Sequence, residues 1–203
     1  MEKGAATLKV AISVLVLVFC TVNKCHLMCG VKTNVVTAVE IHERNTNDSP
    51  ILPSLVETTA KHFDVAEVSA DKGYSSVDNI NAIVKHGAIP FIVFKTSVTG
   101  ASGGLWEKMY HFFQFNRDAF LTHFHKRSNV ESTISMIKAK FRDHVRSKTD
   151  TAMRNEVLCK ALCHNICCLI HAMYELGIDP FFNHSAPMNS ELDEARHVRT
   201  LAI

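Results

Sequence analysis

Short apolar runs alternate with amphipathic segments along the chain, and this alternation constrains the fold more than any other feature. Runs rich in β-branched residues predict strands at residues 26–30, 35–41, 65–70 and 89–94. Helical periodicity fills most of the remaining chain, at residues 51–63, 75–86, 105–115, 118–123, 124–138 and 151–176. Strands that alternate with helices in this way predict an α/β layer fold.

The most specific pattern lies in the segment Phe124–Lys138. Apolar positions within this segment and just after it recur with the spacing of one helix face, namely Val130, Ile134, Ile137, Phe141 and Val145. At roughly 100° per residue, Arg127, Glu131 and Lys138 fall within about 40° of one another. They form a polar stripe beside the apolar face. Taken alone, this stripe also fits a row of ion pairs that contributes little stability.

The R-x3-E-x6-K spacing of these three residues resembles the signature of IS4-type DDE transposases, with Phe124 where the family usually has Tyr. Other segments resemble the same family in the same order: 30–41 (GVKTNVVTAVEI), 69–74 (SADKGY), 125–132 (HKRSNVES), 145–149 (VRSKT) and 155–166 (NEVLCKALCHNI). The resemblance covers residues 25–180. It implies a DDE transposase catalytic domain with a ribonuclease-H-like fold, a mixed sheet flanked by helices.

The family reaction is DNA cleavage and strand transfer during transposition, and it uses two divalent cations, Mg²⁺ or Mn²⁺. Asp71 matches the second Asp of the family motif and Glu131 matches the closing Glu. The resemblance therefore implies that Asp71 and Glu131 are catalytic metal ligands. Without the family motif, a turn or helix-capping role is the favoured interpretation of Asp71. The partners implied are transposon ends, target DNA, and a homo-oligomer or a mixed oligomer with an intact transposase.

The first Asp of the family motif has no counterpart. The family carries it on a strand ahead of the segment that matches residues 25–33, and this chain has no Asp before Asp48. Asp48 lies in N-D-S-P and is predicted to cap a helix. We therefore expect a sheet that is incomplete at its N-terminal strand, in an N-terminally truncated domain that is inactive alone. A non-catalytic DNA-binding or regulatory remnant is the alternative.

Residues 1–24 differ from the rest of the chain. Lys3 and Lys9 precede an uncharged run, Val10–Val22, which resembles the start of a secretory signal but is short for a membrane span. The favoured interpretation is a leader foreign to the family. The alternatives are a signal or anchor of a secreted or membrane protein, and a core strand or helix. Residues 181–203 show no periodicity and predict a loose C-terminal tail.

Basic side chains surround the signature. The resemblance implies that Arg127 and Lys138 hold phosphate, and Lys72 follows Asp71 closely enough to touch DNA. Further cations make the end of the helix basic and predict sequence-independent phosphate contacts, namely Lys140, Arg142, Arg146 and Lys148. A solvated charged face is the alternative. The net charge of +2 is too small to indicate nucleic-acid binding by itself.

Seven cysteines in 203 residues do not predict a disulfide framework. We interpret them as reduced thiols of a cytoplasmic protein. Cys159, Cys163 and Cys167 recur every four residues, but one helix alone cannot complete a tetrahedral metal site. Buried free cysteines in a core helix are the favoured interpretation.

Overall fold

A computed structural model of the chain describes residues 10–18 and 23–177, and the side chains of residues 15–18 are not described. The chain divides into two compact units, residues 1–169 and 170–203. The first unit holds the five strands and the candidate functional residues. The predicted tail at 181–203 lies outside the described residues.

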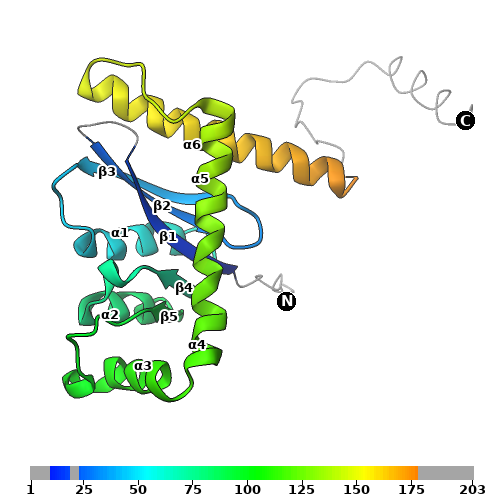
Figure 1. The fold of residues 1–203 in the computed structure, drawn as a ribbon. Coiled ribbons are helices and arrows are strands. Elements are labelled where there is room, and N and C mark those ends of the chain that lie inside the picture. The colour runs from blue at the N-terminus through cyan, green and yellow to red at the C-terminus, as the bar shows by residue number, and fades with distance from the viewer. Residues whose placement is uncertain (1–9, 19–22, 178–203) are drawn as a thin grey trace, which may run out of the picture. The chain divides into compact units, whose positions relative to one another are not determined.

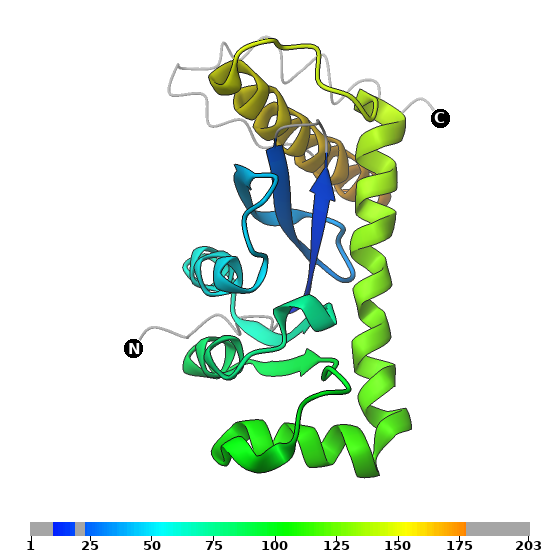
Figure 2. The same ribbon diagram turned by 60° about the vertical axis from the view of Figure 1, so that its left-hand side comes forward.

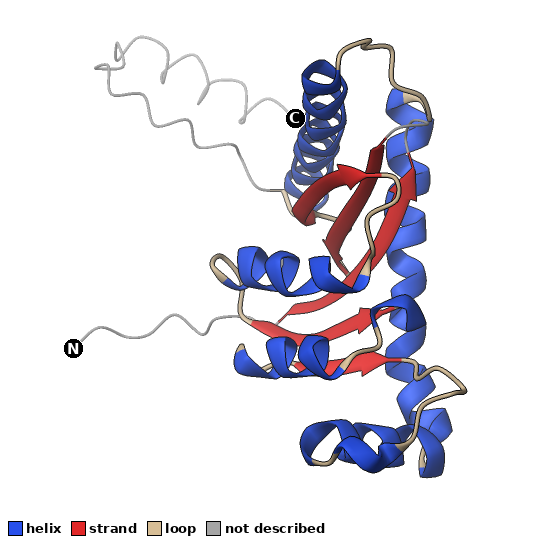
Figure 3. Ribbon diagram, turned by 90° about the vertical axis from the view of Figure 1, so that its left-hand side faces the viewer, coloured by secondary structure: helices blue, strands red, loops and turns tan. Residues whose placement is uncertain are grey.

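The five strands form one mixed sheet in the order β3-β2-β1-β4-β5. The strands are β1 (Val10–Val18), β2 (Asn23–Gly30), β3 (Val36–Glu43), β4 (Val65–Ala70) and β5 (Ile89–Ile92). β1, β2 and β3 pair antiparallel, whereas β4 pairs parallel with both β1 and β5. Helices lie on both sides of the sheet (Figure 3). The predicted α/β architecture, a mixed sheet flanked by helices, is thus confirmed.

The expectation that the sheet lacks its N-terminal strand is wrong, because Val10–Val18 forms the central strand β1. Ile12 pairs with Gly30 of β2 on one side and with Val68 of β4 on the other. Ile12 and Val14 are fully buried. The sequence of a central strand that is covered on both faces is a continuous apolar run. The apolar part of a signal peptide has the same pattern, so the sequence alone does not distinguish the two. Residues 1–9 and 19–22 of the expected leader lie outside the described residues.

The helices α1 (Leu52–Ala60) and α2 (Val77–Lys85) cover one face of the sheet. Their core cluster includes Ile12, Val14, Met28, Leu52, Leu55, Val68, Ala70 and Ile83. The hydroxyl of Ser76 caps α2 by accepting a hydrogen bond from the Asn79 N–H. This layer leaves the alternate residues of β1 and β4 to face the other side.

The opposite face carries α5 (Ser128–Phe141) and the first part of α6 (Asp150–Glu175). Their shared cluster comprises Cys25, Leu27, Val36, Ile134, Ile137, Val157 and Ala161. The helix α4 (Arg117–Phe124) leads through a 3₁₀ turn, His125–Arg127, directly into α5 (Figures 1 and 2). The two helices run one after the other along the sheet. The signature residues Arg127 and Glu131 therefore lie at the junction between α4 and α5.

A third cluster, largely aromatic, fills the space between the edge strand β5, α2, α4 and α3 (Gly104–Phe115). It includes Phe91, Phe94, Trp106, Phe113 and Phe120. The Trp106 ring is buried, and its Nε1 donates a hydrogen bond to the Thr99 carbonyl at 3.1 Å. This cluster fixes α4, and with it the turn that precedes α5.

Within the described part of the chain, α6 is the one helix long and apolar enough to cross a membrane, which is weak evidence by itself. It turns Val157, Lys160, Ala161 and His164 inward. Cys159 and Cys163 are exposed, so the interpretation of these thiols as buried core residues is wrong. Only a narrow face of α6 is buried, and Cys159 and Cys163 lie outside that face.

Candidate active site

Asp71 directly follows β4, whose sequence alternates apolar and polar residues. Val68 and Ala70 pack under α1 and α2, so Glu67, Ser69 and Asp71 point to the side of α4 and α5. The Ser69 hydroxyl accordingly donates a hydrogen bond to the His123 carbonyl at 3.1 Å. The strand therefore presents Asp71 to the beginning of α5.

Arg127 joins the two predicted acidic residues. Its Nη1 donates to Asp71 Oδ2 at 3.2 Å and to Glu131 Oε1 at 3.1 Å. Since both carboxylates bond the same nitrogen, their oxygens lie within roughly two hydrogen-bond lengths of each other. The fold thus brings together Asp71 and Glu131, which are far apart in the sequence. Their role as metal ligands remains a prediction.

The position of Arg127 is fixed from two sides. Its guanidinium carbon lies 5.5 Å from the centre of the Phe124 ring, in a cation–π contact. The Ser13 hydroxyl of β1 donates to the carbonyl of Lys126 at 3.1 Å and holds the backbone just before Arg127. Phe124 occupies the position at which the resembled signature has Tyr, and it supplies the same aromatic face. The departure from the signature therefore leaves this support in place.

Sequence reasoning missed a second polar cluster beside this site. Glu67 is only 7% exposed, and its Oε2 lies 2.6 Å from His123 Nδ1. Its other oxygen pairs with the Lys126 ammonium. The His123 ring also stacks on Phe91, with ring centres 4.4 Å apart. The cluster connects β4 to the turn that carries Arg127. The sequence signal for this cluster is the alternation of polar and apolar residues at the end of β4, with polar residues at Glu67, Ser69 and Asp71.

A family model described as the transposase DDE domain matches residues 19–166, which is more than half of the chain. The chain belongs to this family. No curated protein matches it significantly. The match includes residues 19–24 of the segment that we expected to be foreign to the family, and for residues 1–18 that expectation stays a prediction.

Two solved structures resemble this transposase DDE domain weakly. One is a simian T-cell lymphotropic virus intasome in complex with the PP2A regulatory subunit B56 gamma, at 15% identity and a TM-score of 0.36. The match covers 59% of this chain and 48% of that one, so the domain spans about half of that protein. The other is the catalytic core domain of BIV integrase, at 8% identity and a TM-score of 0.34, covering 68% and 86% of the two chains.

The DDE domain has the donor atoms for one hard cation. Mg²⁺ in proteins is commonly held by one or two carboxylates together with water and substrate phosphate, and Asp71 and Glu131 meet that need once Arg127 moves aside. A two-metal site needs more donors. The sequence of β1, VAISVLVLV, contains no carboxylate that could supply them. Within the described residues, no group of three or more His, Cys, Asp or Glu is placed to hold a metal ion.

The predicted DNA-binding cations of the domain are all exposed or partly exposed. Lys72 is exposed in the turn after Asp71, and Lys138 lies partly exposed on α5, about 10 Å along the axis from Glu131. The remaining four are exposed at the end of α5 and in the loop after it, namely Lys140, Arg142, Arg146 and Lys148. At roughly 100° per residue, Lys138 lies near the side of α5 that carries Glu131, whereas Lys140 lies about half a turn around the helix.

A buried polar cluster lies on the other face of the sheet. His26 of β2 is fully buried; its Nδ1 lies 2.9 Å from the Tyr74 hydroxyl, and its Nε2 lies 3.8 Å from Asp48 Oδ1. Burial lowers the pKa of His26 from 6.5 to about 4, although the charge of Asp48 opposes this. Asp48 makes no side-chain helix cap, which corrects that prediction, and instead pairs with Lys24 at 2.8 Å.

Proposed function

We propose that this DDE domain, of the IS4 type, binds the DNA of an insertion sequence but does not cut it alone. The observation that carries this proposal is the placement of Arg127 between Asp71 and Glu131. A guanidinium bridging two carboxylates is a ready phosphate ligand, because its planar fork can exchange carboxylate for phosphate oxygens. The sequence of β1 supplies no third carboxylate.

If a Mg²⁺ or Mn²⁺ ion binds, Asp71 and Glu131 would hold it. Such an ion activates an attacking water and stabilises the charge that develops on a phosphodiester. Arg127 would then turn to the phosphate of the DNA backbone, while Phe124 and the fixed turn keep its side chain at the site. With two carboxylates in place of three, the affinity for the cation is expected to be low.

The proposal predicts that DNA binding depends on Arg127. Replacing Arg127 with Gln should weaken binding to a labelled duplex roughly tenfold, since one charge-assisted contact is worth about 1.4 kcal/mol or more. Lys138→Gln should act in the same direction. Fluorescence anisotropy of the full chain, at a fixed salt concentration, measures this effect.

Lys61→Gln provides the matched control, because it removes one positive charge from α1 on the other side of the sheet. Lys61 is exposed and only 3.9 Å from Glu57, so its loss should leave binding unchanged. Absence of binding by the unmodified chain would refute the DNA-binding part of the proposal. Mg²⁺-dependent nicking or joining of a duplex would refute the part that makes the catalytic centre incomplete.

A further inference from the structure

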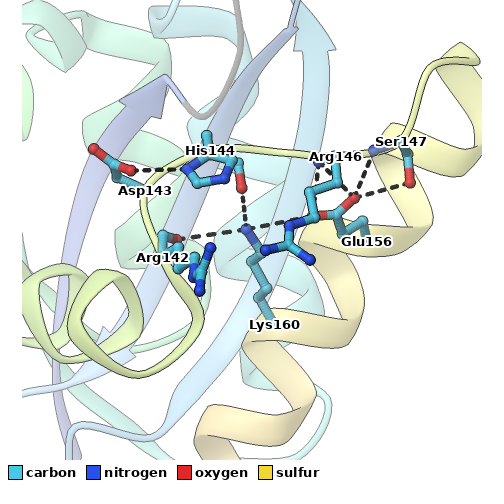
Figure 4. A network of polar contacts seen from close by, with 7 residues as sticks. All are labelled: Arg142, Asp143, His144, Arg146, Ser147, Glu156 and Lys160. Atoms are coloured by element: carbon cyan, nitrogen blue, oxygen red, sulfur yellow. Dashed lines mark hydrogen bonds and ion pairs between the residues drawn. The ribbon is translucent and has the colours of Figure 1, made fainter.

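The loop between α5 and α6 forms an open pocket of about 350 Å³. Its walls are Lys140, Phe141, Arg142, His144, Arg146 and Glu156. Figure 4 shows the polar network of this loop, in which Lys160 and Glu156 of α6 contact the loop residues. Three of the six lining residues carry a permanent positive charge. The pocket therefore favours an anion.

The carboxylate of Glu156, the one acidic residue in the wall of the pocket, is already engaged in hydrogen bonds within the protein. Glu156 accepts hydrogen bonds from the Arg146 and Ser147 N–H groups at 3.0 Å and from the Ser147 hydroxyl at 2.8 Å. Burial opposes its ionisation, but these hydrogen bonds and the Lys160 charge outweigh it and lower the pKa of Glu156 to about 2. Glu156 thus shapes the loop and leaves the cations of the wall available.

The backbone of Arg142 is held in a conformation that normally requires glycine. Its φ of 68° and ψ of 162° fall in a region that is strained for a residue with a Cβ. The buried Lys160 ammonium stabilises this turn by donating to the carbonyls of His144 at 2.6 Å and Arg142 at 3.5 Å. An arginine therefore occupies a position at which glycine would be relaxed.

Among the described residues, the guanidinium groups of Arg142 and Arg146 have no hydrogen-bond or ion-pair partner. Both side chains are exposed. From Glu131 to Arg142, α5 rises about 16 Å, which is about half a turn of B-form DNA. A single duplex that contacts Arg127 is therefore long enough to contact the pocket as well.

We propose that this pocket binds one backbone phosphate of DNA through Arg142 and Arg146, while Lys160 and Glu156 act as positioning residues. The inference rests on the proposed DNA-binding function and adds a second anchoring point to it. A phosphate is the anion that suits two guanidinium groups, each offering paired donors to its oxygens. Since phosphates carry no sequence information, the pocket fixes the register of the duplex and does not read bases.

The test measures binding of a 30-base-pair duplex to the full chain over a range of salt concentrations. Arg142→Gly and Arg146→Gln should each weaken binding about 3- to 10-fold and lower the salt slope by about one. Lys61→Gln should do neither. Arg142→Gly should also raise the melting temperature by about 2–4 °C, because glycine relieves the strain, whereas Arg142→Ala should not.

A second arm adds inorganic phosphate and follows the melting temperature. Loss of phosphate stabilisation in Arg142→Gly with unchanged DNA binding would assign the pocket to free phosphate and overturn the proposal. Unchanged DNA binding without any phosphate effect would overturn it as well. In both cases the unmodified chain still binds DNA, so the proposed function stands. Absence of DNA binding by the unmodified chain would instead overturn both.

Discussion

Replacing Phe120 with Ala is expected to lower the free energy of unfolding by about 3–5 kcal/mol. The Phe120 ring is fully buried at the centre of the aromatic cluster. Its centre lies 5.5 Å from that of Phe91, 5.2 Å from that of Phe113 and 5.8 Å from that of Phe112. The substitution removes the burial of this ring and leaves a cavity between α3, α4 and β5. Urea unfolding monitored by circular dichroism measures the change.

Phe115→Ala is the matched control, since it deletes the same side chain from the end of α3. Phe115 is 79% exposed, so its loss should change the free energy of unfolding by no more than about 0.5 kcal/mol. Equal losses in the two variants would contradict the buried position of Phe120. Because Phe91 also stacks on His123, we expect the Phe120 cavity to loosen the turn that carries Arg127.

The stability of the domain is expected to fall as the pH is lowered from 6.5 to 4, by up to about 1 kcal/mol per pH unit from His26 alone. In the unfolded chain His26 takes up a proton near its ordinary pKa of 6.5, whereas in the fold it does so only near pH 4. Between these values the unfolded state binds more protons, and acid therefore favours unfolding. Above pH 6.5 the contribution of His26 to the free energy of unfolding no longer varies with pH.

His26→Gln should abolish this part of the pH dependence, because glutamine does not titrate in the range. His111→Gln is the control: His111 lies on α3, is about half exposed and is 3.6 Å from Glu107. It should leave the pH dependence unchanged. Chemical unfolding at several pH values between 4 and 7 provides the comparison. A slope that persists in His26→Gln would contradict the assignment of the effect to His26.

The sequence predicts those parts of the site that depend on local patterns. Asp71 directly follows the strand at 65–70 as expected, and helical spacing alone aligns Arg127 with Glu131. Their meeting with Asp71 follows from the family motif, and the Arg127 contacts confirm the geometry. Local periodicity and a matched motif are therefore sufficient to predict this half of the site.

Other parts depend on tertiary context and could not be predicted. An uncharged apolar run has the same pattern in a signal and in a central strand, and only its two hydrogen-bonded neighbours identify Val10–Val18 as β1. Asp48 precedes a proline and resembles a cap, but Lys24 from β2 binds it instead. The conformation of Arg142 leaves no trace in the sequence, because an arginine occupies a position suited to glycine.

The position of β1 affects how the whole sheet is held together. Among the described strands, β1 alone lies between the β2–β3 hairpin and the parallel pair β4–β5 in the strand order. The two halves of the sheet therefore cannot associate through backbone pairing until the first described segment has docked between them. We expect folding to be cooperative for this reason, with Asp71 reaching its place beside α5 only after the chain has closed the long loop from β1 to β4.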